Sequence, residues 1–167
     1  TEEIGDILVS RHQFDPTAAL AAAASADGSA ARALEAGSGD SLEERHIAAE
    51  MLEALASAPN PKRRLETGKQ LAGVRRGGRS SAAADRETLT RRLRALATLL
   101  RDLQVLSARG DRAWLANTDS AEELVGLVRA YDIDRASRGF ACVDRAIAAL
   151  TRNASPKVVV DWLALQL

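Results

Sequence analysis

A leucine seam between positions 85 and 107 is the feature that most constrains how this chain can fold. Its members step by four, three, four and three residues: Leu89, Leu93, Leu96, Leu100 and Leu103. That spacing places one apolar stripe along a long helix, and such a stripe has to be buried against other helices. The seam therefore predicts a helix over 85–107 inside a helical bundle.

The composition extends this prediction to the whole chain. Of the 167 residues, 46% are hydrophobic but only 3% are aromatic, and alanine and leucine supply much of the apolar content. Many strong helix formers with few aromatic or β-branched residues favour an all-α fold. A β-sandwich or a parallel-sheet enzyme is excluded by this composition.

Capping residues and glycines divide the chain into two parts. Three short helices are expected within 1–39: one over 2–11, one from Pro16 after the cap Asp15, and one from Ser29. The Gly-Ser-Gly at 37–39 is the best candidate for a domain boundary. Residues 40–167 are then predicted to form a larger bundle of five or six helices.

The helices of the larger part follow from caps and periodicity. A capping box of Ser41 and Glu44 predicts the first of them. The expected ranges are 41–57, 62–74, 85–107, a helix after Ser120, 134–152 and 156–167, with a flexible loop at 75–81. On the helix over 134–152, the residues predicted to face inward are Phe140, Val143, Ile147 and Leu150.

Charge is unevenly distributed along the chain. Residues 1–61 hold 3 basic and 11 acidic side chains, residues 62–94 hold 11 basic and 3 acidic, and the rest is balanced. A basic stretch can neutralise phosphates, but no aromatic residues interleave here for base stacking. A solvated face or a protein contact is therefore favoured over a nucleic-acid contact. The candidate DNA-binding residues are Arg63, Arg64, Arg75, Arg76 and Arg79.

The residues that usually carry chemistry are isolated in this sequence. Gly68-Lys69 lacks the upstream glycine and the following Ser or Thr of a phosphate-binding loop, so a surface turn is expected. His12 and His46 have no second ligand at metal spacing, and the single cysteine, Cys142, is expected in the core. We predict no catalytic residue, no cofactor and no metal site.

The sequence also bears on where the protein is located in the cell and on whether the chain is part of a longer protein. No apolar run approaches the roughly 18 residues needed to cross a bilayer, and the N-terminus is acidic without an apolar signal region. We expect a cytoplasmic protein without a membrane partner. Because the chain begins at Thr1 rather than Met, we also expect a fragment or processed form of something longer.

Residues 153–167 read N-A-S-P-K-V-V-V-D-W-L-A-L-Q-L. This stretch resembles the closing pattern N-x-N-P-R-L-x-L-E-x-L-L-L-x-L of the delta-prime subunit of bacterial clamp loaders, with Lys157 and Asp161 as close replacements and with Trp162 and the valines at 158–160 as departures. The outright matches are Asn153, Pro156, Leu163, Leu165 and Leu167. Residues 101–106 and 115–119 resemble the family's R-D-L-L-x-L helix and its L-x-N-x-D loop.

A third match bears on the type of subunit. Residues 28–34 resemble the G-S-x-x-R-A-L segment of the lid subdomain in clamp-loader ATPases. Relatives that hydrolyse ATP carry a sensor arginine at the fourth position, where this chain has Ala31 and places Arg32 one residue later. A shift of one residue turns a helical side chain by about 100°. The resemblance thus favours the delta-prime type, which does not hydrolyse ATP.

The resemblance implies a specific architecture and set of partners. Residues 1–39 would be the three-helix lid subdomain, and 40–167 the collar through which five subunits form the ring that loads the sliding clamp. The implied partners are the gamma/tau and delta subunits, with primed DNA and the clamp engaged only through the complex. The candidate interface residues are Trp162, Leu163, Lys157 and Asp161.

Three points qualify this expectation. Trp114 is a second candidate anchor at an interface, although each tryptophan is more often part of an internal core. The same region of a gamma/tau subunit is a close alternative to delta-prime. A rival of another class is an unrelated helical module that binds nucleic acid through 62–94.

Overall fold

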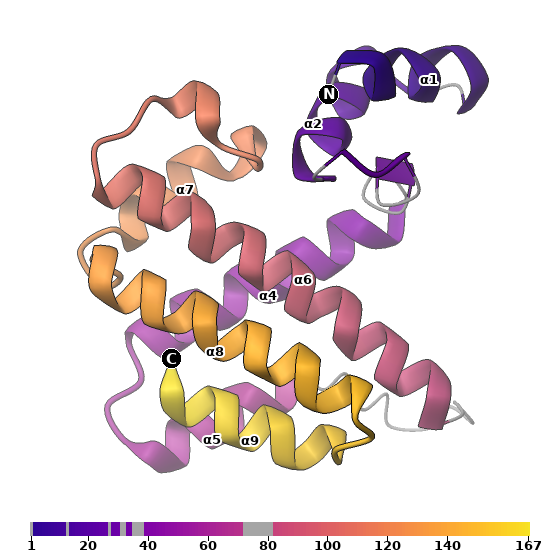
Figure 1. Ribbon diagram of the computed structural model, residues 1–167. Helices are drawn as coiled ribbons and strands as arrows, with labels where there is room; N and C mark the ends of the chain where they lie inside the picture. Colours follow the sequence, from indigo (N-terminus) through magenta and orange to yellow (C-terminus); the bar gives the residue numbers. More distant parts are fainter. Residues whose placement is uncertain (1, 13, 27, 31–32, 35–38, 72–81) are drawn as a thin grey trace.

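The fold is given by a computed structural model, which describes residues 2–12, 14–26, 28–30, 33–34, 39–71 and 82–167. Throughout these ranges the regular structure is α-helix or short 3-10 helix, without a strand. This confirms the all-α prediction (Figure 1).

The N-terminal part has a small core of its own. Helices α1 (Glu2–His12) and α2 (Pro16–Ser25) pack against each other. The carboxylate of Asp15 accepts a hydrogen bond from the N–H of Ala18 at 3.2 Å, as a helix cap does. Residue 28 has a φ of 80°, which glycine adopts without steric cost. The buried cluster contains Leu8, Ala19, Ala22, Ala26 and Ala33.

Among the described residues from 39 onward, eight further helical segments follow. They are α4 (Gly39–Ala56), α5 (Pro61–Leu71), α6 (Ala82–Ser107), η1 (Arg112–Trp114), η2 (Thr118–Ser120), α7 (Ala121–Leu127), α8 (Ile133–Thr151) and α9 (Pro156–Gln166). Most of the predicted boundaries agree with these to within a few residues. The predicted loop at 75–81 and the end of the third short helix lie outside the described residues.

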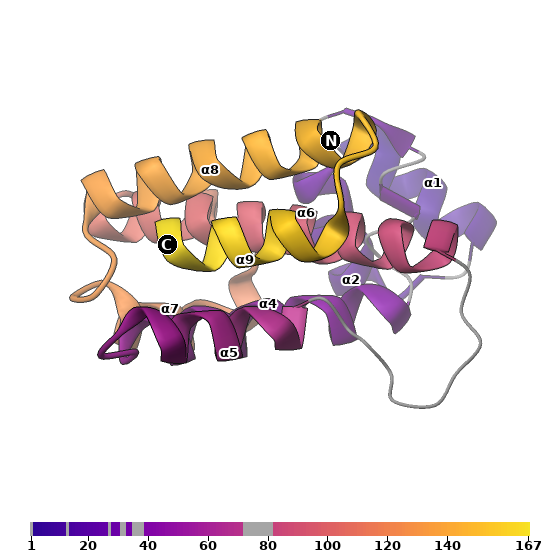
Figure 2. The same ribbon diagram turned by 90° about the horizontal axis from the view of Figure 1, so that it is seen from below.

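Helix α6 is the centre of the larger part. It packs against α4 on one side, α8 on another, and also contacts α7 and η1. Helix α9 lies against both α5 and α8. Figure 2 shows α8 along one edge, α4 and α5 along the opposite edge, and α6 and α9 between them. The predicted bundle around the leucine seam is therefore the observed arrangement.

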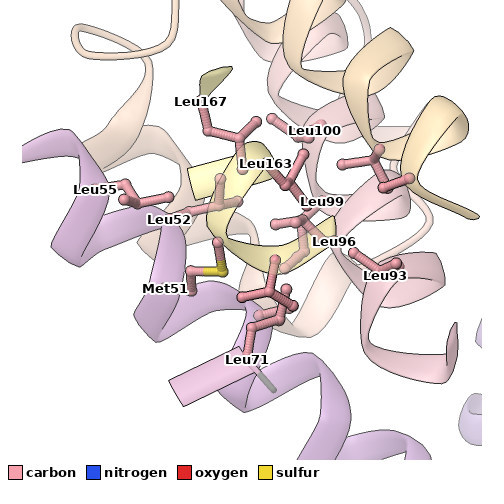
Figure 3. Close-up of a cluster of buried hydrophobic side chains, with 14 of the residues drawn as sticks. Met51, Leu52, Leu55, Leu71, Leu93, Leu96, Leu99, Leu100, Leu163 and Leu167 are labelled. Carbon is pink, nitrogen blue, oxygen red and sulfur yellow. The ribbon is translucent and has the colours of Figure 1, made fainter. Parts of the chain in front are cut away.

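The seam forms the main core, as predicted. Its five leucines are fully buried, together with Leu99 on the same helix. Figure 3 shows the side chains of Met51, Leu52 and Leu55 from α4 meeting those of α6, α5 and α9. Burying a leucine side chain contributes about 2 kcal/mol. This cluster is thus the main source of stability in the part of the chain that the structure describes.

The prediction that Phe140 faces inward is wrong. Its side chain is 40% exposed, and the inward line of α8 is built largely from small residues: Ala136, Gly139, Val143, Ala146 and Leu150. A Cβ atom on Gly139 would lie 3.0 Å from Leu167 Cδ2 and 3.2 Å from Leu100 Cδ2. Small residues let α8 approach its neighbours closely, so the inward face cannot be recognised from large apolar residues alone.

The expected surface turn at Gly68 is also wrong. Gly68 lies inside α5 and is buried where that helix meets α9. A Cβ atom there would lie 2.8 Å from Ala164 Cβ and 3.4 Å from Val160 Cγ1. The glycine is therefore explained by helix packing. Cys142 is half-buried against the main core, close to the interior position expected for it.

Candidate functional site

The described arginines of the basic segment differ in what they contact. Arg64 is half-buried and donates a hydrogen bond from Nη1 to the carbonyl oxygen of Ala164, 3.4 Å away. Arg63 is exposed and pairs with Glu66 at 3.4 Å. The remaining candidates, Arg75, Arg76 and Arg79, lie outside the described residues. Arg64 thus holds α5 to the end of α9.

Glu44 does not take the capping role predicted for it. Helix α4 begins at Gly39, so Ser41 lies within the helix. The Glu44 carboxylate is buried and pairs with the guanidinium of Arg92, which also donates to the carbonyl oxygen of Leu71 at 3.0 Å. A buried carboxylate requires a cation and hydrogen bonds, and this requirement outweighs a local helix cap. The pair joins α4, α5 and α6.

Another arginine of α6 binds the turn between α8 and α9. Arg86 donates from Nη1 to the carbonyl oxygens of Leu150 and Ala154, both at 2.9 Å. At this turn Asn153 has a φ of 63°, a left-handed conformation that asparagine tolerates better than most residues. Pro156 then begins α9 with its fixed φ and no N–H to satisfy.

The two stretches of the R-D-L and L-x-N-x-D resemblance meet in one buried network. Asp102 is fully buried and accepts hydrogen bonds from the N–H groups of Ala116 and Asn117, at 2.9 and 2.8 Å. It also accepts from the side-chain amide of Asn117. Asn117 Oδ1 in turn accepts from Arg45, which pairs with Asp119 at 3.5 Å. The network holds the 110–120 connection against α6 and α4.

Tyr131 is a second buried polar link. Its hydroxyl donates to the carbonyl oxygen of Leu52 at 3.1 Å, and the guanidinium of Arg135 lies 4.4 Å from its ring centre. Arg135 also donates to the carbonyl oxygen of Leu167 at 2.9 Å. Burial raises the pKa of Tyr131 to about 12, although Arg135 and Arg64 act in the opposite direction. The tyrosine therefore connects α4 with the region where α8 and the C-terminal residue meet.

The four predicted interface residues of α9 lie in different environments. Leu163 is fully buried in the main core and Lys157 is exposed. Asp161 and Trp162 are half-buried, and Trp162 packs partly against the core. The structure therefore places the side chain of Leu163 in the interior and the other three at the surface.

Sequence reasoning missed two apolar residues on the same helix. Val158 is 64% exposed and Leu165 is 44% exposed. With Trp162 they are spaced by four and three residues, so all three share one face of α9. We call this face the α9 stripe. The spacing of four and three residues could have indicated this face in the sequence. It is hard to recognise there because Val159, Val160 and Leu163 form a stronger apolar line on the opposite side of the helix.

Trp114 is not a core residue, so the expectation of an internal position is wrong for it. Its side chain is 64% exposed, whereas Leu115 and Ala116 are buried. Asp111 caps η1, and Asp102 accepts a hydrogen bond from the backbone N–H of Ala116. These two contacts fix the backbone path and thereby determine which side chains of this connection face the interior. Trp114 is left on the outside of a well-held connection.

The groups considered for chemistry are spread over the surface. His12 is exposed, and His46 lies 3.3 Å from Glu50 on the exposed side of α4. Within the described ranges, no three His, Cys, Asp or Glu residues gather closely enough to hold a metal ion. The sensor position, Ala31, lies outside those ranges.

None of the described helices combines the length and apolar character needed to cross a membrane. Comparison of the chain with models of protein families, with curated proteins and with solved structures finds no match.

Proposed function

We propose that this chain is an assembly module of a bacterial DNA polymerase III clamp loader, similar to the delta-prime subunit. In this proposal 1–39 form the lid subdomain and 40–167 the collar, and neither part has a catalytic role. The collar holds the gamma/tau and delta subunits in the ring that loads the sliding clamp onto primed DNA. The setting is cytoplasmic.

The observation that carries the proposal is the α9 stripe. Val158 and Leu165 are exposed and Trp162 between them is half-buried, so the described chain leaves this apolar face partly uncovered. Tryptophan is enriched among the residues that dominate interface energetics, and half-buried aromatic side chains make rigid anchors. Lys157 and Asp161 lie beside this face and supply opposite charges at its border. An apolar face with a charged rim is the usual organisation of a protein interface.

The places taken by the resembling residues support the choice of family. Asp102 and Asn117, from separate matched stretches, bind each other directly. Asn153 adopts the left-handed turn conformation and Pro156 starts α9. Matched positions thus coincide with residues that determine the local geometry of the bundle. This is the pattern expected where sequences share a fold.

Two alternatives make different predictions. If the parent protein carries a complete phosphate-binding loop, the chain belongs to the gamma/tau type instead. The module that binds nucleic acid through 62–94 is less well supported, because Arg64 is already bound to the end of α9.

Reconstitution with defined partners tests the proposal. The chain is mixed with purified gamma/tau and delta subunits of its source bacterium, after nuclease treatment, and complexes are separated by size-exclusion chromatography. We expect a stoichiometric complex that survives moderate salt. Failure to form any complex with either subunit would contradict the assembly role.

Paired variants locate the contact. Val158→Asp with Leu165→Asp places charges on the α9 stripe and is expected to abolish the complex. Val125→Asp with Ile133→Asp adds the same charges at exposed apolar residues of α7 and α8, and should leave it intact. Equal loss in both double variants would show that the stripe is not the contact surface.

A further inference from the structure

Three arginines lie in a line along the outer side of α8, the last of them at the residue that directly follows the helix. Arg138, Arg145 and Arg152 are all exposed and are spaced by seven residues. No hydrogen bond or ion pair joins their guanidinium groups to the rest of the described chain. Seven residues make almost two helical turns, so the three side chains share one side of the helix. We call this line the arginine ridge.

The ridge lies at the edge of the bundle. Helix α8 packs closely against α6 and α9, and Figure 2 shows it along the outer edge, opposite α4 and α5. Each step of seven residues advances about 10.5 Å, so the ridge extends for about 21 Å. Ala141 and Ala148 lie between the arginines, and they are too small to cover them.

Other arginines of α6 and α8 have structural partners, which the ridge lacks. Arg86 and Arg135 bind backbone carbonyl groups, and Arg92 is paired with Glu44. These contacts explain why the fold needs a cation at those positions. No such explanation applies to the ridge, so its charges are free to meet an external anion.

The acidic residues of α8 do not neutralise the ridge. Asp134 lies four residues before Arg138 on the same side of the helix, in the first turn, where its negative charge also interacts favourably with the helix dipole. Asp144 is exposed one residue before Arg145, which places it about 100° away around the helix. Neither forms an ion pair with a ridge arginine.

We propose that the arginine ridge binds the phosphodiester backbone of nucleic acid, without regard to base sequence. Guanidinium groups match phosphate geometry and remain charged at every physiological pH. Duplex DNA rises 3.4 Å per base pair along its axis, so a ridge of about 21 Å spans roughly six base pairs. Backbone contacts of this kind position a protein on nucleic acid without reading its sequence.

An acidic protein surface is the main competing occupant, and the ridge is poorly suited to it. Protein interfaces contain an apolar centre, but between Arg138 and Arg152 the ridge line holds only arginine and alanine, and Asp134 lies beyond its N-terminal end. Phe140, which is exposed on α8, is two residues from Arg138 and so lies on another side of the helix. The proposal does not depend on the assembly role of the α9 stripe.

Fluorescence anisotropy with two labelled probes tests the ridge. The full chain is titrated into a 20-nucleotide single strand and into a 20-base-pair duplex, over a series of salt concentrations. The variant Arg138→Gln, Arg145→Gln and Arg152→Gln should bind at least tenfold more weakly at low salt. Its plot of log affinity against log salt should be flatter by about 2.7 for the duplex and about 2.1 for the single strand.

A matched control separates the ridge from total charge. Lys62→Gln, Arg63→Gln and Lys69→Gln remove the same charge from exposed residues of α5. This variant should stay within twofold of the unaltered chain. Because all six residues are exposed, both triple variants should keep the melting temperature; a single Arg145→Glu change, expected to weaken binding severalfold, provides a second test.

Three results would overturn the proposal. The first is an unaltered chain that shows no salt-dependent binding to either probe. The second is an equal loss of affinity in the two triple variants, which would indicate a general charge effect. The third is a polyglutamate peptide that displaces the probes as well as an unlabelled oligonucleotide does, since the ridge would then be a site for acidic protein.

Discussion

The carboxylate of Asp102 and the side-chain amide of Asn117 are joined by a 2.8 Å hydrogen bond in a fully enclosed site. Asp102 belongs to α6, whereas Asn117 belongs to the connection that leads to α7. Two backbone N–H groups also donate to the carboxylate, and Arg101 Nη1 lies 3.7 Å from its Oδ1. One acidic residue therefore determines the path of a segment that is otherwise irregular.

Replacement of Asp102 by asparagine should destabilise the fold. One acceptor oxygen becomes a donor, which faces the N–H groups of Ala116 or Asn117 and leaves them without a partner. Unsatisfied buried donors of this kind cost about 3 kcal/mol in total. Chemical denaturation measures the change. Asp144→Asn, at an exposed position of α8, is the control and should stay within about 0.5 kcal/mol of the unaltered chain.

The buried pair of Arg92 and Glu44 should show strong coupling. Arg92→Met leaves the carboxylate of Glu44 buried without its main cation and should cost about 3–5 kcal/mol. Adding Glu44→Leu removes that charge and should recover most of the loss. A double-mutant cycle by urea denaturation gives the interaction energy; additive effects of the two substitutions would contradict the pairing.

Two glycine substitutions should change stability in opposite directions. Gly68→Ala places a Cβ atom 2.8 Å from Ala164 Cβ, so α5 and α9 must separate. Overpacking costs about 1–3 kcal/mol, which exceeds the gain of about 1 kcal/mol in helix propensity. Gly126→Ala on α7 meets nothing within 4 Å and should stabilise by up to about 1 kcal/mol. Thermal denaturation of both variants measures these changes in stability. If both substitutions stabilised the fold, or both destabilised it, the packing explanation would be contradicted.

Tyr131 should make the fold sensitive to alkali. Burial raises its pKa to about 12 in the folded chain, above its value of 10.0 in model compounds. The unfolded state therefore loses the proton first, so stability is complete below about pH 10 and falls as pH rises toward 12. The loss by pH 12 is of the order of 2–3 kcal/mol.

The same residue allows a direct measurement. The chain has one tyrosine, so tyrosinate absorbance reports on Tyr131 alone. We expect no ionisation at pH 10 in the folded chain and ordinary titration in denaturant. In Tyr131→Phe, the corresponding loss of stability between pH 10 and 12 should disappear. If Tyr131 titrated near pH 10 in the folded chain, the burial of its hydroxyl group would be contradicted.

Local sequence signals predicted the helices accurately where a residue acts on its own neighbours. Asp15 and Pro156 begin helices at the expected places, because caps and the fixed φ of proline need no distant partner. The capping box at Ser41 failed because the partner of Glu44 is Arg92, which lies 48 residues away. A local motif cannot show that one of its residues will instead form an ion pair with a residue distant in the sequence.

The candidate site could be predicted only in part, for the same reason. The sequence drew attention to α9, to Lys157, Asp161 and Trp162, but it did not separate the buried Leu163 from the exposed Leu165. It directed the search for nucleic-acid contacts to the basic run at 62–94 and overlooked the arginine ridge. Charge density along a chain does not show which cations the fold uses internally.

The sequence by itself determined the all-α class, the positions of most helices and the leucine seam at their centre, since propensity and periodicity are properties of short stretches. Only the tertiary structure decided which faces are covered. Gly68 and Gly139 became close contacts between helices, and Trp114 stayed outside. These outcomes depend on how closely two helices that are distant in the sequence approach one another. That distance is set jointly by the side chains of both helices, so neither segment determines it alone.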